Sequence, residues 1–337
     1  MNKLFIDGII YSLQKHGGIS TVFNELIKRL PYDYYNLILY NQNNFNYIKS
    51  TNNLIYKPRI LERYREVNLN TEYKLFHSTY YRCPANKNMK SIQTVHDFIY
   101  ERYNKGIKKR LHILQKSKAI NNADVIICVS NNTKNDLLNY YGASFENKCK
   151  VIHNAASSNF RQLNYIINKT QVLYIGNRAN YKNFKSLVLA ISKVFELNLV
   201  IVGSQLTKEE HIFLKKNLPF RFTHLGYLSN EELNIQYNIS LCLVYPSLYE
   251  GFGIPVLEAM QSGCPVLAVN NSSIPEIIPE KNFLLEIGNV DEIESSLKKM
   301  LNVDYRNSFI NYGLNRAKDF NWENTYKNTL QIYNSLL

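Results

Sequence analysis

Short apolar runs alternate with amphipathic stretches along the first half of the chain. Stretches of helical period lie between them, such as GGISTVFNELIKRL at 17–30. Strands that are buried on both faces have continuous apolar runs, and helices between them return the chain to the same edge of a sheet. The pattern therefore predicts a parallel sheet covered by helices on both faces. The predicted strands lie at 3–10, 35–40, 74–78, 91–97, 124–130 and 150–154.

The alternation pauses at 157–169 and then begins again. A second series of predicted strands lies at 171–177, 197–204, 221–228, 239–247 and 264–270. Two series predict two doubly wound, Rossmann-like α/β domains that face each other across a cleft. Such sheets bind ligands beyond the carboxyl ends of their strands, so the candidate chemistry is expected in the strand-to-helix turns.

One such turn lies in PSLYEGFGIPVLEAMQSGCPVLAVN, at 246–270. A buried strand is predicted before LYEGFG, and a helix after it with Pro255 in its first turn and Gly263 at its end. The start of this helix can present backbone N–H groups to a phosphate. Glu250 precedes the turn and Glu258 lies in the second helical turn, so the two carboxylates can reach different parts of one ligand.

This turn allows two other interpretations. Glu258 could serve only to complement the helix dipole. A dinucleotide-binding turn is disfavoured, because GFGIPV lacks the third glycine and follows a late strand.

Composition narrows the class of protein. The 337 residues are 45% apolar and 20% charged, which is typical of globular proteins and sufficient for two domains. Lys3 and Asp7 interrupt the first apolar run, which favours a buried strand over a signal peptide. No window reaches the ~18 apolar residues of a membrane-spanning helix. The five cysteines are scattered without a CxxC pair, which favours free thiols in a cytosolic protein.

The net charge of +13 is unevenly distributed. Residues 1–168 contain 24 Lys and Arg against 11 Asp and Glu, whereas residues 169–337 contain 16 of each. Much of the excess lies at 105–118, where a helix would place Ile107, Leu111 and Leu114 on one face. A solvated surface helix, an anionic membrane surface and a nucleic acid all fit this charge. The candidate contacts of this segment are Lys105, Lys108, Lys109 and Arg110.

Several motifs together resemble a known family. The spacing E-x7-E from Glu250 to Glu258 resembles the signature of retaining GT-B glycosyltransferases of the family 4 type. Further similar segments are GGIS at 17–20, TVHDF at 94–98, ICVSNNTKNDLL at 127–138, VIHNAASSNF at 151–160, LYIGNRANYKNF at 173–184 and LVIVGS at 199–204. A combination of three stretches further resembles bacterial transferases that build O-antigen or related surface polysaccharides. These stretches are LFIDGIIYSLQKHGGIS, FHSTYYRCP and NRANYKNF.

The resemblance implies a GT-B fold with three parts. Residues 1–165 would form the acceptor-binding domain, 166–320 the domain that binds the nucleotide-sugar donor, and 321–337 a helix that crosses back to the first domain. The acceptor pocket is expected near the irregular segment 53–74, so the acceptor's identity is the least readable feature.

The resemblance also implies roles for individual residues. Arg178 and Lys182 match a cationic pair on the donor diphosphate, and Glu250 matches an acid that holds sugar hydroxyls. His96 matches an active-site histidine near the transferred sugar, although a lone histidine after a strand is more often structural. Glu258 would bind the ribose. The remaining expected donor contacts are Gly17, Gly18, Tyr227, Leu228, Gly251, Phe252, Gly253 and Ile254.

The implied activity is transfer of a hexose with retention at the anomeric carbon. The donor would be a nucleoside-diphosphate sugar, with GDP-mannose or a related GDP-sugar favoured. The acceptor would be a polyprenyl-diphosphate-linked oligosaccharide at the inner face of the cell membrane. No covalent nucleophile stands out, and no cofactor or metal is expected because the two cations would neutralise the diphosphate. The alternative is a non-catalytic protein that binds polyanions or nucleic acid, which the lack of basic strands with interleaved aromatics disfavours.

Overall fold

The computed structural model describes residues 4–14, 17–40, 53–69, 73–164 and 168–337. The chain forms two compact units. The first contains residues 1–154 together with 322–337, and the second contains residues 155–321. Each unit is a parallel α/β sheet with its own helices, so the predicted two-domain, doubly wound fold is confirmed.

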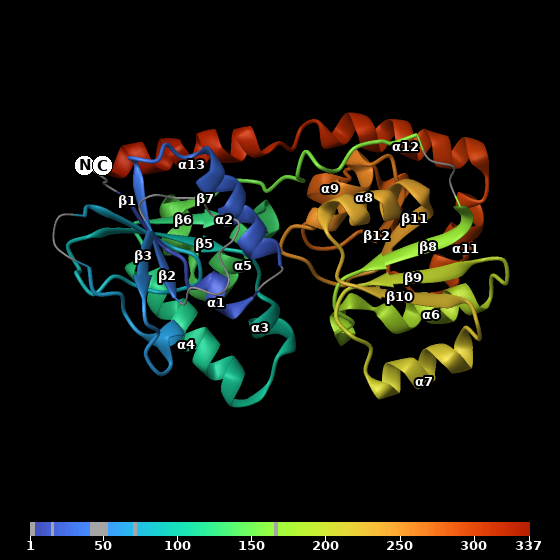
Figure 1. The fold of residues 1–337 in the computed structure, drawn as a ribbon, viewed down its shortest axis with the longest axis horizontal. Helices are drawn as coiled ribbons and strands as arrows, with labels where there is room; N and C mark the ends of the chain where they lie inside the picture. The colour runs from blue at the N-terminus through green and yellow to red at the C-terminus, as the bar shows by residue number, and fades with distance from the viewer. Residues whose placement is uncertain (1–3, 15–16, 41–52, 70–72, 165–167) are drawn as a thin grey trace. The chain divides into compact units, whose positions relative to one another are not determined.

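The first unit has a seven-stranded sheet in the order β3-β2-β1-β4-β5-β6-β7, with every neighbouring pair parallel (Figure 1). Its strands are β1 (Leu4–Asp7), β2 (Tyr35–Tyr40), β3 (Asn53–Tyr56), β4 (Leu75–Ser78), β5 (Lys90–Val95), β6 (Val125–Cys128) and β7 (Cys149–Val151). Its helices are α1 (Ile10–Leu13), α2 (Gly18–Arg29), α3 (Ile99–Tyr103), α4 (Gly106–Asn122), α5 (Asn131–Tyr141) and α13 (Trp322–Leu336), with short 3-10 turns η2 (Glu62–Tyr64) and η3 (Ala143–Lys148).

The second unit has a six-stranded parallel sheet in the order β10-β9-β8-β11-β12-β13. Its strands are β8 (Asn168–Ile175), β9 (Asn198–Val202), β10 (Phe222–Gly226), β11 (Ser240–Tyr245), β12 (Val266–Val269) and β13 (Leu284–Leu285). Its helices are α6 (Phe184–Ser192), α7 (Lys208–Asn217), α8 (Asn230–Ile239), α9 (Ile254–Gln261), α10 (Ile274–Ile277), α11 (Val290–Met300) and α12 (Val303–Ala317), with turns η4 (Asn180–Lys182) and η5 (Lys281–Phe283).

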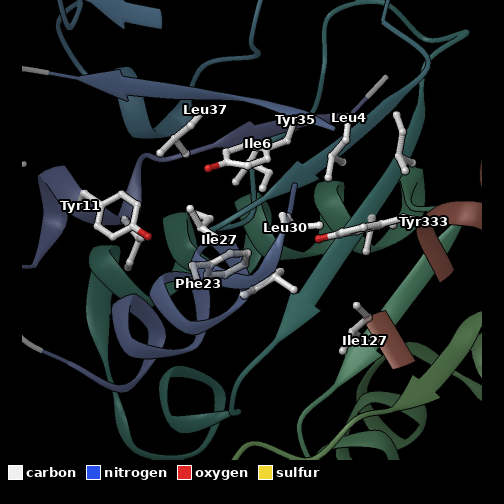
Figure 2. Packing of buried hydrophobic residues seen from close by; sticks show 14 of the residues in the cluster. Leu4, Ile6, Tyr11, Phe23, Ile27, Leu30, Tyr35, Leu37, Ile127 and Tyr333 are labelled. Carbon is white, nitrogen blue, oxygen red and sulfur yellow. The ribbon is translucent and has the colours of Figure 1, made fainter. Parts of the chain in front are cut away.

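The last helix, α13, belongs to the core of the first unit and packs along α2 (Figure 1). The Tyr333 ring is fully buried among apolar side chains of α2 and the sheet, including Leu30 and Tyr35 (Figure 2). Its hydroxyl lies 2.6 Å from Nδ1 of His77 on β4. The first sheet is therefore covered by residues from both ends of the chain.

The boundary between the units lies at residue 154, whereas the sequence analysis placed it at residue 165. The segment between these positions is attached to α8. The backbone N–H of Arg161 donates to Asn234 Oδ1 at 3.1 Å, and that of Leu163 donates to Asn238 Oδ1 at 2.7 Å. These bonds assign the segment to the second unit.

In the parts of the chain that the structure describes, no helix is both long enough and apolar enough to cross a bilayer.

Candidate functional site

The carboxyl ends of β8 and β11 bring two predicted site residues together. The two strands are neighbours and run parallel, so the loops that follow them meet at one edge of the sheet. Lys182 follows β8 and Glu250 follows β11, and Lys182 Nζ lies 2.5 Å from Glu250 Oε1. Both side chains are buried, and Lys182 Nζ also lies 3.3 Å from the hydroxyl of Tyr245. The result is a buried ion pair at the carboxyl edge of the second sheet.

Local backbone geometry fixes Lys182 in this place. The residue closes the 3-10 turn η4, and Asn183 adopts a left-handed conformation with φ of 55° before α6 begins. The backbone N–H of Leu248 donates to the carbonyl of Tyr181 at 2.7 Å, which joins the two loops directly. Asn183 Nδ2 donates to the carbonyl of Gly288 at 2.7 Å. The loop is therefore anchored on both sides of Lys182, at Tyr181 and at Asn183.

Arg178 lies in the same loop as Lys182, but its side chain is held by residues that follow β9. Its Nε lies 2.9 Å from Glu210 Oε1, and its Nη2 donates to the carbonyl of Gln205 at 2.7 Å. The Nη1 atom is buried without a hydrogen-bond partner among the described residues. Glu210 is itself fixed, because its Oε2 accepts from the backbone N–H of Thr207 in the capping box of α7. Arg178 is thus a positioned cation with an unused donor.

Two serines form hydrogen bonds with the backbone of the glycine turn before α9. The backbone N–H of Glu250 donates to Ser272 Oγ at 2.8 Å, and the Ser273 hydroxyl lies 2.7 Å from the Phe252 carbonyl. Gly253 has φ of 113°, and a Cβ at this position would lie 2.9 Å from Ile274 Cδ1. Only glycine fits this turn without strain. Ile254 then begins α9, with proline in its first turn.

Glu258 projects from α9 and bonds to a buried tyrosine. The Tyr237 hydroxyl donates to Glu258 Oε2 at 2.9 Å. Burial raises the pKa of Glu258 to about 7, and the bond from Tyr237 only partly offsets this. Glu258 therefore changes charge near neutral pH, which a purely dipole-complementing surface acid would not do.

Two further expected donor contacts follow the edge strand of the same sheet. Tyr227 and Leu228 come directly after β10, at the same edge as the loops of Lys182 and Glu250. The Tyr227 side chain is 64% exposed. Ser229 then caps α8 and fixes where the helix begins.

The remaining predicted site residues lie in the first unit. His96 follows β5 and is buried, with Nε2 lacking a hydrogen-bond partner among the described residues. Burial, with a smaller contribution from the charge of Lys116, lowers its pKa to about 3, so the ring is neutral at physiological pH. Gly17 is the N-cap of α2 and Gly18 its first residue. Contact of these three residues with a donor stays a prediction.

The basic segment at 105–118 forms α4, and its charges are not equivalent. Lys105, Lys108 and Arg110 are exposed. Lys109 is half-buried and donates to the carbonyl of Glu101 at 2.7 Å. Lys116 is fully buried, with Nζ 2.9 Å from Glu101 Oε1.

Sequence reasoning did not identify three of the residues that build this site. Tyr245 is one of several residues in a uniformly buried strand, so no pattern marks it as a partner of Lys182. Glu210 is recognisable as the acid of a Thr-x-x-Glu capping box, but its contact with Arg178 depends on the tertiary fold. Tyr237 has the helical spacing of an ordinary core residue.

Comparison with known proteins identifies the family of the chain. The family described as "Glycosyltransferase Family 4" matches residues 16–159, and the family described as "Glycosyl transferases group 1" matches residues 157–316. The two matches overlap at residues 157–159 and together cover most of the chain. The protein belongs to the GT-B glycosyltransferases of this family 4, group 1 type.

Two curated relatives share about a quarter of their residues with this chain over the aligned region. O-antigen chain mannosyltransferase B of Escherichia coli is 26% identical over 310 residues, which cover 84% of this chain and 80% of the relative. O-antigen chain mannosyltransferase RfbU of Salmonella typhimurium is 27% identical over 255 residues, covering 71% and 70%. The structure of sucrose-phosphate synthase from Thermosynechococcus elongatus has the same fold, with a TM-score of 0.78, 19% identity, and coverage of 100% of this chain and 99% of that one.

Proposed function

We propose that this glycosyltransferase transfers a hexose, with retention of anomeric configuration, from a nucleoside-diphosphate sugar to a lipid-linked oligosaccharide. The buried Lys182–Glu250 pair at the carboxyl ends of β8 and β11, beside the glycine turn of α9, carries the proposal. The names of two relatives favour mannose as the sugar and a surface polysaccharide such as O-antigen as the product. GDP-mannose, or a related GDP-sugar, is the favoured donor.

Lys182 and Arg178 would neutralise the donor diphosphate. Charge accumulates on the leaving phosphate as the glycosidic bond breaks, and preorganised cations stabilise it most where water is excluded. Lys182 is buried and fixed by its loop, and Arg178 keeps one buried donor, Nη1, unused. Both cations are therefore in place before the donor arrives.

Glu250 would hold the hydroxyls of the transferred sugar while its bond with Lys182 keeps the side chain oriented. Backbone N–H groups at Gly251, Phe252, Gly253 and Ile254 would face the diphosphate, since the start of a helix favours anions. Glu258 would accept hydrogen bonds from the ribose, and Tyr227 and Leu228 would contact the base.

The reaction would break the bond between the anomeric carbon and the β-phosphate oxygen, and that oxygen would take the bonding electrons. The acceptor hydroxyl would attack the same face of the sugar. Its proton would pass to the departing phosphate oxygen, which serves as the base. No covalent enzyme intermediate is required.

Two cations at the diphosphate support turnover without a divalent metal. Full activity in excess EDTA is the expected result. Complete loss of activity in EDTA, restored by Mg2+ or Mn2+, would contradict this part of the proposal.

The first unit would bind the acceptor and approach the inner face of the cell membrane as a peripheral protein. The whole excess of positive charge lies in residues 1–168. Each cation close to an anionic leaflet contributes about 1 kcal/mol, and the attraction decays over about 8 Å. Lys105, Lys108 and Arg110 are exposed at the start of α4 and available for this contact.

A sugar-nucleotide panel tests the function. The purified protein is incubated with GDP-, UDP- and dTDP-sugars, and released nucleotide and transferred sugar are quantified. NMR of the glycoside then gives the configuration of the anomeric carbon. Release of GDP from GDP-mannose with an α-linked product supports the proposal. Turnover of no sugar nucleotide, or inversion at the anomeric carbon, contradicts it.

A further inference from the structure

Helix α4 presents its apolar face to solvent. Ile107, Leu111 and Leu114 share one face of the helix, and they are 75%, 45% and 67% exposed. A surface helix of a globular protein normally buries such a stripe. The buried face of α4 carries His112 and Lys116 together with the apolar Ala119 and Ile120, so the stripe is not part of that face. An exposed apolar stripe of this kind marks a binding surface.

Two residues of this stripe, Leu111 and Leu114, form one wall of a groove in the first unit. The groove has a volume of about 360 Å³, which lies within the ~300–1,000 Å³ of small-molecule sites. The opposite walls come from the segment around η2 and from the loop after β4. Its apolar and aromatic lining consists of Leu61, Tyr64, Tyr81, Cys83, Leu111 and Leu114.

Two lining residues have strained backbones. Leu61 has φ of 59° and Tyr81 has φ of 51°, both in the left-handed region that bulky residues rarely adopt. The Leu61 side chain is nevertheless 68% exposed, so core packing does not explain its conformation. Strain of this kind is concentrated where a ligand is held.

The rim of the groove is positively charged. Arg63, Arg65 and Lys118 line it, and Glu66 is the acid beside them. Glu66 pairs with Lys118 at 2.7 Å, which leaves the two arginines in excess. The Arg63 guanidinium lies 4.9 Å from the centre of the Tyr64 ring, and its Nε has no hydrogen-bond partner among the described residues. A cationic rim above an apolar channel is complementary to an amphiphilic anion.

The groove adjoins the turn that carries His96. Tyr81 lines the groove, and its buried hydroxyl hydrogen-bonds with the backbone of His96. The Tyr81 ring also packs edge-on against His112, with ring centres 5.6 Å apart. One residue thus forms part of both the groove and the carboxyl edge of the first sheet.

We propose that this groove binds the hydrocarbon chain of a lipid phosphate or diphosphate, with the chain against Leu61, Leu111 and Leu114 and the anion on Arg63 and Arg65. The biological occupant rests on the proposed function, in which it is the lipid part of the acceptor. Binding itself requires no donor and no turnover.

Equilibrium dialysis with prenyl diphosphates of different length tests the proposal. Isopentenyl, geranyl and farnesyl diphosphate carry the same anion on apolar chains of increasing length. We expect affinity to rise with length, with farnesyl diphosphate at least about tenfold tighter than isopentenyl diphosphate, because each added unit buries more apolar surface. Equal affinity for all three would overturn the proposal.

Matched variants locate the site. Leu114→Gln should weaken farnesyl diphosphate at least about fivefold and leave isopentenyl diphosphate unchanged. Ile212→Gln is the control, because Ile212 lies on α7 of the second unit and is also 67% exposed. Arg65→Ala should weaken all three ligands. Equal effects of Leu114→Gln and Ile212→Gln would refute this placement of the chain.

Vesicles separate a groove from a bilayer contact. If Leu114→Gln abolishes binding to neutral phosphatidylcholine vesicles while farnesyl diphosphate affinity is unchanged, the stripe inserts into the bilayer and the groove proposal is wrong. These assays contain no sugar nucleotide. Failure of transfer activity with intact, length-dependent lipid binding would therefore refute the proposed function alone.

Discussion

The hydroxyl of Tyr237 donates a hydrogen bond of 2.9 Å to Glu258, yet burial still raises the pKa of Glu258 to about 7. A carboxyl group in an unfolded chain titrates near 4.5. The folded unit therefore holds a proton between these two values that the unfolded chain has released, so the contribution of Glu258 to stability is greatest below pH 4.5 and is lost as the pH rises to 7.

Glu258→Gln should reduce this loss of stability, because the amide remains neutral at every pH. Between pH 5 and pH 8 the wild type should lose on the order of 2 kcal/mol more than the variant. Thermal or urea unfolding at the two pH values measures the difference. The same pH dependence in both proteins would show that Glu258 does not titrate in this range.

Nucleotide affinity should follow the same titration. If Glu258 binds the ribose as a carboxylate, GDP should bind more tightly to the wild type as the pH rises from 6 to 8. The Glu258→Gln variant should bind GDP more weakly. Its affinity should be nearly independent of pH apart from the titration of GDP itself, which affects both proteins alike and cancels when the two curves are compared. Calorimetry across this range gives the result, and parallel curves for the two proteins would remove Glu258 from the nucleotide site.

Lys116 should stabilise the turn after β5. Its Nζ lies 2.9 Å from Glu101 Oε1 and 3.5 Å from the centre of the Phe98 ring, and the side chain is fully buried. Lys116→Met leaves the buried carboxylate of Glu101 unpaired, so we expect a loss of about 3–5 kcal/mol of unfolding free energy. Adding Glu101→Gln should recover part of the loss. Losses of the two single variants that simply add in the double variant would show that the charges do not interact.

Attachment to anionic vesicles should depend on the exposed cations of α4. Lys108→Glu with Arg110→Glu should reduce co-sedimentation with anionic vesicles and leave any binding to neutral vesicles unchanged. Lys215→Glu with Lys216→Glu on α7 makes the same change in net charge and is the control. High salt should release the wild type, because surface charges are screened. Equal loss in both double variants would indicate an effect of net charge alone.

The parallel sheet explains why two residues singled out from the sequence lie together, although their contact was not predicted. Glu250 and Lys182 each follow a buried strand, and the carboxyl ends of parallel strands lie at the same edge of a sheet. The partner of Arg178 depends on how α7 packs, which no local pattern contains.

The orientation of α4 could not be predicted from the sequence. Periodicity places Ile107, Leu111 and Leu114 on one face, but it does not say whether that face is buried. The Lys116 side chain is buried because Glu101, from α3, compensates its charge. Similarly, the left-handed backbone of Leu61 has no signal in residue type, because leucine rarely adopts this conformation.

Stabilisation of the leaving diphosphate by Lys182 is the step on which the proposed activity depends, and a matched pair of lysine variants tests it. Lys182 is buried on Glu250, whereas Lys185 is exposed in the first turn of α6. With GDP-mannose, or whichever sugar nucleotide the panel identifies, Lys182→Ala should lower kcat by ~100-fold or more while Lys185→Ala stays near the wild-type value. Circular dichroism confirms that both variants are folded. If a folded Lys182→Ala variant has the same kcat as Lys185→Ala, Lys182 does not stabilise the leaving diphosphate.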